Sequence, residues 1–200
     1  QSKIMITFER IGHLGRLANQ MFQYSTLFAI ANKQGYDFAI PSDNKKVIDS
    51  SYNPVIDKAD YMYLQILECF ELTGKVLPLA DIQYNKTFDH GRDYAKFSPE
   101  VLNITDGTNI KGYFQSYKYF DSIRDLIKKE FKPLIELKAS QYFDELKKQY
   151  NVNTITGVHI RHGDVKSEKG ARLVLLNSEY YKKAMSKFRD TDNLFVIFSD

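Results

Sequence analysis

Tryptophan is absent from this chain of 200 residues, and cysteine occurs only once. The single cysteine, Cys69, excludes a disulfide within the chain, and the apolar stretch around it, residues 61–70, favours a small core residue over a nucleophile. No run approaches the ~20 apolar residues that a membrane helix needs, and residues 1–8 lack the form of a signal peptide. We therefore expect neither a disulfide framework nor a membrane segment within this chain.

An excess of charge of one sign is also missing. The chain has 28 basic and 25 acidic residues, a formal net charge of +3, and its lysines are spread along the sequence in short pairs. A nucleic-acid-binding protein concentrates basic residues in a patch or stripe. We expect no nucleic-acid partner, and the contents of 43% hydrophobic and 26% charged residues are those of an ordinary globular protein.

Strand-like and helix-like patterns alternate along the chain. Strands are predicted at residues 4–8, 36–40, 82–88, 109–114, 153–161 and 193–199. Helices are predicted at residues 18–33, ending at Gly35, at 116–131 and 134–150, separated by Pro133, and at 178–188, capped by Ser178. Residues 61–70 fit either a strand or a buried helix. The alternation predicts an α/β fold with a mainly parallel sheet, and the polar end of the third helix places a domain boundary after residue 150.

Residues 157–164 read as a strand that brings a cation to a turn. Val158 and Ile160 fall on one face of an extended segment, and His159 and Arg161 fall on the other. An arginine at the carboxyl end of a strand suits a nucleotide pyrophosphate, because its guanidinium binds phosphate oxygens through two parallel hydrogen bonds. An ion pair between Arg161 and Asp164 that closes the strand end explains the same pattern.

Several other chemistries lack their motifs. Gly12 and Gly15 do not form a GxGxxG loop, Gly74-Lys75 is followed by valine rather than by the serine or threonine of a P-loop, and no GxSxG elbow occurs. No HExxH pair is present, and we expect no metal at His159, His162 and Asp164.

Three phrases in the sequence together resemble glycosyltransferase family 11, whose members make α-1,2-fucosyl linkages. Residues 15–25 read GRLANQMFQYS, residues 112–120 read GYFQSYKYF, and residues 159–165 read HIRHGDV. The family typically carries a GRLGNQM-like turn into a helix, a GYFQSxxYF segment and an HxRRGDY-like motif in this order. The aromatic residues of the second phrase, Tyr113 to Phe120, fit either a sugar platform or plain core.

The resemblance implies a GT-B arrangement of two Rossmann-like domains. Residues 1–150 would form the N-terminal α/β domain on the acceptor side, and residues 151–200 would begin an incomplete GDP-fucose-binding domain. The implied reaction is inverting transfer of L-fucose from GDP-fucose to the 2-hydroxyl of a galactose-containing glycan, without a metal cofactor. The implied partners are therefore GDP-fucose and a galactoside acceptor.

The resemblance also implies residue roles. Arg161 would stabilise the departing pyrophosphate, because preorganised positive charge does this best. Asp164 and Glu168 are candidates for the base near the acceptor hydroxyl, although Asp164 fits equally a residue that orients Arg161 and Glu168 a solvated loop residue. The predicted donor-binding residues are His159, Arg161, His162, Gly163, Arg16 and Asn19.

Departures from the family pattern leave a second function open. His162 stands where the second arginine is usual, Val165 replaces an aromatic residue, and Ala18 replaces a frequent glycine. Residues 196–200 match the FSDD strand end of the family, after which members usually continue, so we expect this chain to be a piece of a longer protein. The alternative to an active transferase is a catalytically impaired remnant that binds a nucleotide sugar or a carbohydrate.

Overall fold

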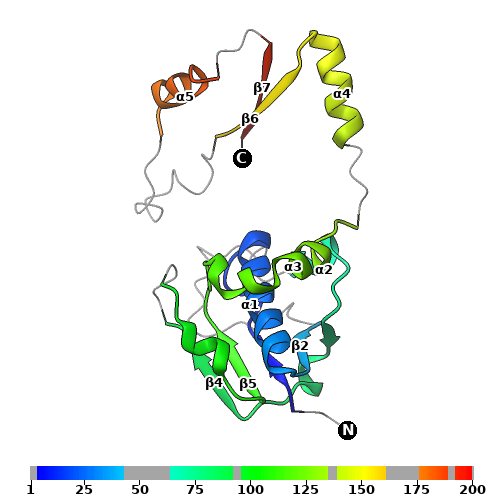
Figure 1. Cartoon of the computed structure of the whole chain (residues 1–200), viewed down its shortest axis with the longest axis vertical. Helices are drawn as coiled ribbons and strands as arrows, with labels where there is room; N and C mark the ends of the chain where they lie inside the picture. The colour runs from blue at the N-terminus through cyan, green and yellow to red at the C-terminus, as the bar shows by residue number, and fades with distance from the viewer. Residues whose placement is uncertain are drawn as a thin grey trace. The chain divides into compact units, whose positions relative to one another are not determined.

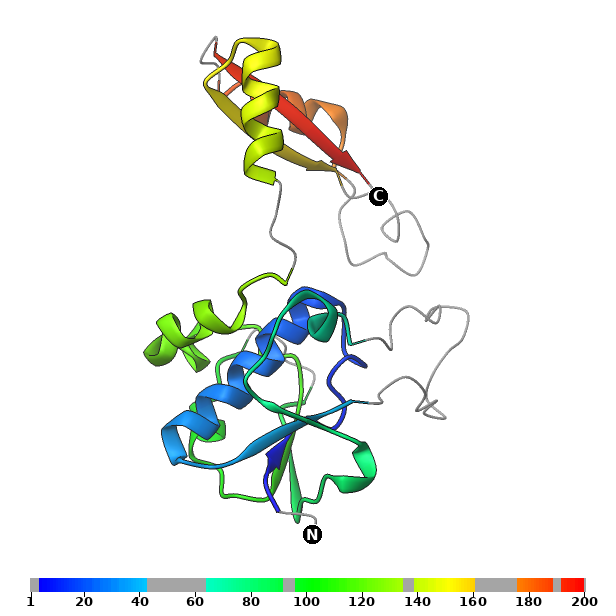
Figure 2. The same cartoon turned by 90° about the vertical axis from the view of Figure 1, so that its right-hand side faces the viewer.

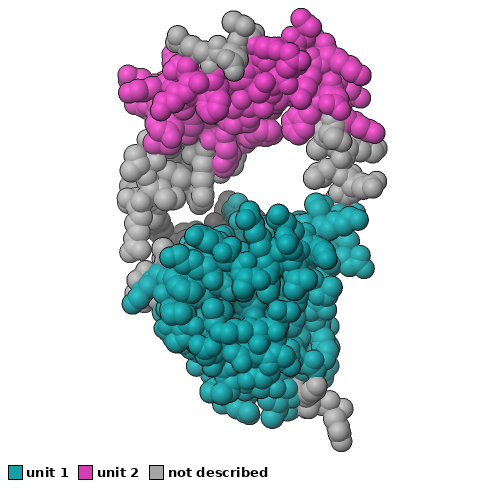
Figure 3. Space-filling model, in the orientation of Figure 1, with its two compact units in different colours: residues 1–135 teal, residues 136–200 magenta. Residues whose placement is uncertain are grey.

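The structure is a computed structural model that describes residues 4–42, 64–91, 96–134, 139–160, 176–188 and 192–199. The chain divides into two compact units, unit 1 of residues 1–135 and unit 2 of residues 136–200 (Figures 1 and 3). The sequence places the boundary after residue 150, whereas the units divide at residue 135. Helix α4 (Ala139–Tyr150) belongs to unit 2 because it contacts strand β6 (Thr154–Ile160).

The described part of unit 1 has five strands and a series of helical segments. In chain order they are β1 (Ile6–Thr7), α1 (Leu17–Gln34), β2 (Phe38–Pro41), α2 (Gln65–Cys69), β3 (Lys75–Leu77), the 3-10 turn η2 (Leu79–Asp81), β4 (Lys86–Asp89), η3 (Pro99–Asn103), β5 (Thr108–Lys111), η4 (Tyr117–Tyr119), η5 (Asp121–Ile123) and α3 (Arg124–Glu130). The part of the chain that the structure describes has no helix with the length and apolarity to cross a membrane.

The sheet of unit 1 is entirely parallel and has the strand order β3-β2-β1-β5-β4. The chain leaves the central strand β1 through α1 toward β2 on one side, and it later enters β5 from β4 on the other side. The direction of winding therefore reverses between β1 and β5. This sheet confirms the predicted α/β fold with a mainly parallel sheet, and it is consistent with a Rossmann-like domain.

Helix α1 covers one face of the sheet (Figures 1 and 2). It extends one residue beyond each end of the predicted helix, and it ends at Gly35, whose φ of 71° and ψ of 27° form a left-handed cap. Apolar positions of the helix, such as Tyr24, Leu27 and Ile30, have no solvent exposure. Burying such a side chain contributes roughly 1.5–3 kcal/mol to the free energy of folding. The packing of α1 against this face of the sheet therefore stabilises unit 1.

The main core lies between α1 and the sheet. It contains fully buried residues from the strands, from α1 and from the segments on either side of β5: Ile6, Phe8, Ile11, Tyr24, Leu27, Ile30, Ile40, Ile66, Val101, Ile110, Phe114 and Tyr119. A smaller cluster lies apart from it and consists of Met5 just before β1, Ala39 of β2 and Ile82 just after η2. Met5 and Ala39 alternate with the core residues Ile6, Phe38 and Ile40. Alternate residues of a strand point to opposite faces, so the smaller cluster belongs to the face away from α1.

Two sequence predictions need correction where tertiary contacts override the local pattern. The helix predicted at residues 116–131 is two 3-10 turns followed by the shorter α3, with φ of −130° at Phe120 and −120° at Ile123 interrupting the helical path. Burial of Tyr119 and contact of Phe120 with Phe22 hold this path. The predicted strand at 82–88 begins only at Lys86.

Two short elements have weak signals in the sequence. The ambiguous stretch at 61–70 contains helix α2. Residues 61–63 of that stretch lie outside the described residues. Strand β3, three residues long, was not predicted, because Lys75 and Val76 are exposed and the segment has no apolar alternation.

Unit 2 contains α4, β6, α5 (Ser178–Met185) and β7 (Asn193–Ser199). The strands β6 and β7 pair in parallel along their full length, from Thr154 opposite Asn193 to Ile160 opposite Ser199. The cap of α5 is the side chain of Asn177, which accepts from the amide of Tyr180, so the predicted cap at Ser178 is wrong by one residue. Whether unit 2 begins a GDP-fucose-binding domain stays a prediction.

Burial differs sharply between the two units. None of the described residues of unit 2 is fully buried, and Ile197 and Phe198 on β7 are more than half exposed. A hollow of about 390 Å³ lined by side chains of α4, β6 and β7, including Phe143 and Phe198, remains within this unit. Within its described residues, unit 2 is therefore held by backbone pairing far more than by a packed core.

A buried polar network joins helices α1 and α3 and the two residues just before β3. Glu130 is only 4% exposed, and its carboxylate accepts from the hydroxyl of Tyr24 at 2.6 Å and from the amide and hydroxyl of Thr73 at 2.9 and 2.6 Å. The hydroxyl of Tyr24 also accepts from the amide of Gly74 at 3.0 Å. Each buried polar group here has a partner, which is the condition for burying a carboxylate at acceptable cost.

Replacing Tyr24 by phenylalanine tests this network. Tyr24→Phe leaves the amide of Gly74 and one oxygen of Glu130 short of a partner, so we expect the free energy of unfolding to fall by about 1–3 kcal/mol. Urea unfolding at neutral pH measures the change. Tyr142→Phe is the matched control, because the side chain of Tyr142 is 56% exposed, and it should change the free energy by less than about 0.5 kcal/mol.

The same network predicts an alkaline dependence. Burial, with the hydrogen bond to Glu130, raises the pKa of Tyr24 far above its ordinary value of about 10. The folded chain thus binds this proton more tightly than the unfolded chain, so the contribution of Tyr24 is complete below about pH 10 and declines above it. The difference in unfolding free energy between wild type and Tyr24→Phe should shrink above about pH 10, and a constant difference from about pH 8 to about pH 11 would contradict this assignment.

Candidate functional site

The candidate site of unit 1 lies where the carboxyl ends of β1 and β5 meet. In parallel α/β sheets, ligands bind outside the carboxyl ends of the strands at the point where the winding reverses. Two loops lie there, residues 8–16 after β1 and residues 112–116 after β5. The first two of the three sequence phrases begin in these loops.

Glycine shapes the loop after β1. Gly12 and Gly15 have φ of 87° and 97°, values that favour glycine over residues with a side chain. A Cβ atom on Gly15 would lie 1.9 Å from the Nδ2 atom of Asn19, so the loop and the first turn of α1 leave no room for a side chain. Arg16 follows in an extended conformation at the N-cap of α1 and is exposed.

Amide side chains hold this loop against α1 and α2. The side chain of Gln23 donates to the carbonyl oxygen of Leu14 at 2.9 Å, and that of Gln20 donates to the carbonyl oxygen of Gly15 at 3.4 Å. The Oε1 atom of Gln20 also accepts from the amide of Ile66 at 3.1 Å. Gln20 and Gln23 are buried, so they hold the backbone of the loop in position and do not face the solvent.

Asn19 and Gln115 join the first turn of α1 to the loop after β5. The Nε2 atom of Gln115 donates to the Oδ1 atom of Asn19 at 2.6 Å, across 96 positions of sequence. Gln115 follows Phe114, which has a φ of 52° although it is not glycine, and a strained backbone of this kind persists only where its surroundings hold it. Phe114 is fully buried, which supplies that constraint.

A second cluster supports the turn after β5. The hydroxyl of Tyr119 accepts from the amide of Ser98 at 2.8 Å, and the Nε2 atom of His90 lies 3.0 Å from that hydroxyl. The ring of His90 lies 4.9 Å from that of Phe114, and burial raises the pKa of the Tyr119 phenol. Phe114 and Tyr119 thus belong to the core rather than to a sugar platform, whereas Tyr117 is 61% exposed.

The structure places only some of the predicted site residues. Arg16 and Asn19 lie in the loop and first turn after β1, with Asn19 held by Gln115. His159 is exposed on β6, and its neighbours Val158 and Ile160 are half-buried, which is the predicted alternation. The remaining predicted residues lie outside the described residues: Arg161, His162, Gly163, Asp164 and Glu168. Among the described residues, no group of three or more His, Cys, Asp or Glu side chains is arranged to hold a metal ion.

Sequence reasoning missed two residues of the site. Gln115 lies within the second phrase but was assigned no role, and Gln65 was not considered, although its side chain accepts from the amide of Leu17 at 2.8 Å. Both are polar residues inside aromatic or apolar stretches. A polar residue within such a stretch was the sequence signal that could have indicated their role.

Gly15→Ala tests the close contact between the loop and Asn19. The new Cβ atom would displace the side chain of Asn19 from Gln115, so we expect a loss of stability above the roughly 1–3 kcal/mol of backbone strain and a shift of the side-chain amide resonances of Gln115. Gly35→Ala is the matched control, since Gly35 also has positive φ, but a Cβ atom added to it would meet no neighbouring atom within 4 Å. Equal destabilisation by the two substitutions would contradict the role of the contact.

Comparison with known proteins agrees with the three phrases. The mouse galactoside alpha-(1,2)-fucosyltransferase 2 is 26% identical over 200 residues, covering 95% of this chain and 52% of the relative. The mouse galactoside 2-alpha-L-fucosyltransferase Sec1 is 28% identical over 196 residues, covering 93% and 48%, and the bovine SEC1 protein is 27% identical over 195 residues with the same coverage. The chain thus spans about half the length of these relatives.

The family comparison covers almost the whole chain. No solved structure matches it significantly, so the sequence comparisons carry the assignment. The family described as glycosyl transferase family 11 matches residues 2–200, which include both candidate loops of unit 1 and the strand β6 that leads to Arg161. The chain therefore belongs to glycosyltransferase family 11.

Proposed function

We propose that this chain is part of an inverting fucosyltransferase that moves L-fucose from GDP-fucose to the 2-hydroxyl of a galactoside. The observation that carries the proposal is the hydrogen bond between Asn19 and Gln115, which joins two family phrases at the switch point of a parallel sheet. The names of the related proteins support the same reaction, since they describe galactoside α-(1,2)-fucosyltransferases.

This reaction requires stabilisation of the leaving group. As the bond between the anomeric carbon and the phosphate oxygen breaks, negative charge builds up on the pyrophosphate, and a fixed cation stabilises it. Arg161 directly follows β6 and is the residue that we assign to this role, because a guanidinium binds two phosphate oxygens at once. His162 would donate a second hydrogen bond, and His159 and Gly163 would complete this side of the donor site.

The acceptor hydroxyl needs a group that takes its proton. Asp164 and Glu168 are the candidates nearest to Arg161 in the sequence. A carboxylate accepts a proton efficiently only within hydrogen-bond reach of the hydroxyl. Arg16 and Asn19 are assigned to donor binding from unit 1, where an exposed cation and a fixed amide offer complementary contacts to phosphate and hydroxyl oxygens.

A binding protein without catalysis is the second candidate function. The substitution of the usual second arginine by His162 favours it, because histidine has an ordinary pKa of ~6.5 and carries its charge only in part at neutral pH. Such a protein would bind GDP-fucose and not release fucose.

Calorimetric titration with GDP and GDP-fucose, with and without Mg²⁺, tests the donor site. We expect metal-independent binding that Arg161→Lys weakens at least about tenfold, because a point charge cannot reproduce the two parallel hydrogen bonds. Arg124→Lys is the control, since Arg124 is exposed at the start of α3 and should leave the affinity unchanged. Unchanged GDP affinity in Arg161→Lys would remove the assignment.

Product analysis separates the two functions. Fucose transferred to a β-galactoside, detected by mass spectrometry, supports the transferase. Binding of GDP-fucose that depends on Arg161 without transfer or release of fucose supports the binding protein instead.

A further inference from the structure

The face of the unit 1 sheet away from α1 is polar at the carboxyl ends of three strands. On the α1 side, Phe8, Phe88 and Ile110 pack into or against the main core. Polar residues occupy the alternate positions of the same segments: Thr7, Glu9, Thr87, Asp89, Asn109 and Lys111. Strands of parallel sheets are usually apolar on both faces, and a local rule is most often broken at a functional site.

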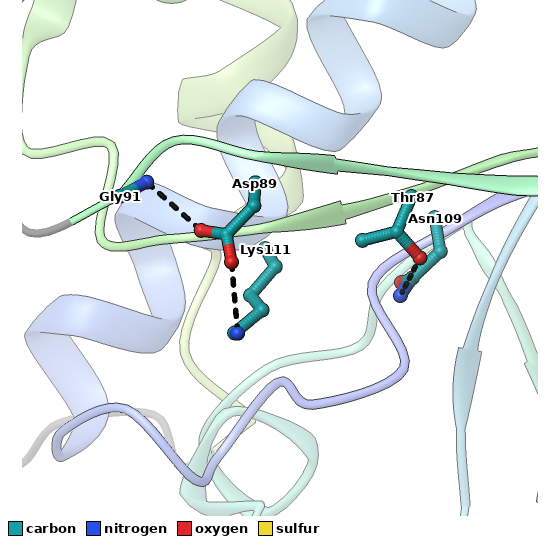
Figure 4. A network of polar contacts seen from close by, with 5 residues as sticks. All are labelled: Thr87, Asp89, Gly91, Asn109 and Lys111. Carbon is teal, nitrogen blue, oxygen red and sulfur yellow. Dashed lines mark hydrogen bonds and ion pairs between the residues drawn. The ribbon is translucent and has the colours of Figure 1, made fainter.

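The polar side chains form rows across the strands. Asn109 on β5 lies opposite both Thr7 on β1 and Thr87 on β4, and Lys111 lies opposite Asp89. Figure 4 shows the side chains of Thr87, Asp89, Asn109 and Lys111 on the same side of the two strands. One row consists of Thr7, Asn109 and Thr87, and the next, closer to the carboxyl ends of the strands, consists of Lys111 and Asp89.

Hydrogen bonds fix these side chains in place. The Oδ1 atom of Asn109 accepts from the amide of Glu9 at 2.9 Å, and its Nδ2 atom donates to the hydroxyl of Thr87 at 3.4 Å. The carboxylate of Asp89 accepts from Lys111 Nζ at 2.9 Å and from the amide of Gly91 at 2.8 Å (Figure 4). A surface that is already ordered loses little conformational entropy when a ligand binds.

Glu9 and Tyr84 extend the arrangement. The hydroxyl of Tyr84 donates to the Oε2 atom of Glu9 at 2.8 Å, and this hydrogen bond raises the pKa of the phenol, which therefore stays protonated at neutral pH. The hydrogen bond from Lys111 lowers the pKa of Asp89, which therefore stays ionised. We call Glu9, Tyr84, Asp89, Asn109 and Lys111 the polar shelf.

The chemistry of the polar shelf fits a neutral sugar. The carboxylates of Glu9 and Asp89 accept hydrogen bonds and the ammonium of Lys111 donates them, whereas sugar hydroxyls do both. Asn109 is only 3% exposed and both atoms of its amide have partners, so it orders the polar shelf rather than contacts the sugar. The half-buried ring of Tyr84 adds an aromatic surface of the kind on which the apolar side of a sugar ring lies.

We propose that the polar shelf is the binding subsite for the acceptor galactoside. This inference rests on the proposed function for the identity of the sugar, and it locates the acceptor on residues of unit 1 alone. The side chains of Asp89 and Lys111 are 51% and 38% exposed, so a sugar reaches them without a change in the sheet.

The test uses methyl β-galactopyranoside as the probe and the 200-residue chain labelled with ¹⁵N. We expect amide resonances of residues 84–91 and 108–112 to shift on titration. Asp89→Asn should weaken the binding about tenfold or more, the loss expected when a hydrogen bond to a charged group is removed. Lys111→Met, which removes the donor and keeps a similar aliphatic stem, should weaken it by a similar factor.

Asp37→Asn is the matched control. Asp37 forms an ion pair with Lys75 at 3.0 Å, with side chains 40% and 50% exposed, at the amino ends of β2 and β3 rather than at the carboxyl edge. The control should change galactoside affinity by less than about twofold, because loss of an exposed ion pair has little effect on the fold. Melting curves of all variants establish that each one is folded.

Titration of the same samples with GDP-fucose separates failure of this inference from failure of the proposed function. Absence of galactoside binding in a folded chain, unchanged affinity in Asp89→Asn, or an equal loss in Asp37→Asn would overturn the polar shelf and leave donor binding untouched. Galactoside binding that depends on Asp89 in a chain that does not bind GDP-fucose would support the shelf and count against the proposed transfer.

Discussion

The structure of unit 1 depends on the position of β1 at the centre of its sheet. This strand is only two residues long, yet it pairs with β2 on one side and β5 on the other. Ile6 and Thr7 have no solvent exposure, and the chain leaves the sheet through the loop of residues 8–16 before α1 returns over its face. The close contact between Gly15 and Asn19 and the buried amides of Gln20 and Gln23 fix the loop between β1 and α1.

The same constraint places the candidate site. A helix that returns over β1 puts its first turn beside the loop that follows β5, because β5 is the neighbour on the side opposite to β2. Asn19 and Gln115 meet there, on backbone held by buried residues of both loops. Preorganisation of this kind serves a binding site better than flexible side chains do, since the cost of ordering has been met during folding. The polar shelf shares this property, because its side chains are also fixed by hydrogen bonds.

Much of this fold was predictable from sequence, since its signals are local. The helix α1 shows apolar spacing and a terminal glycine, and strand β7 was predicted with its observed ends. Contacts between distant segments were not predictable in the same way. The burial of Tyr119 breaks a helix that the local pattern favours, and β3 pairs with β2 although its own residues are largely exposed. The link between Asn19 and Gln115 required the strand order, which no single segment specifies.

The two units offer different support to the residues assigned to them. The loops of unit 1 lie on a sheet whose α1 side is closed by fully buried side chains, and Phe114 keeps a strained backbone there because its ring is enclosed. In unit 2, the strand that leads to Arg161 is paired with β7, but its own apolar residues are only half-buried. Backbone pairing fixes the direction of β6, whereas the precision of a charge at its end depends on packing around that charge. Under the proposed assignment, the role of Arg161 therefore depends on what surrounds the end of β6, whereas the residues proposed for the acceptor lie on the well-packed sheet of unit 1.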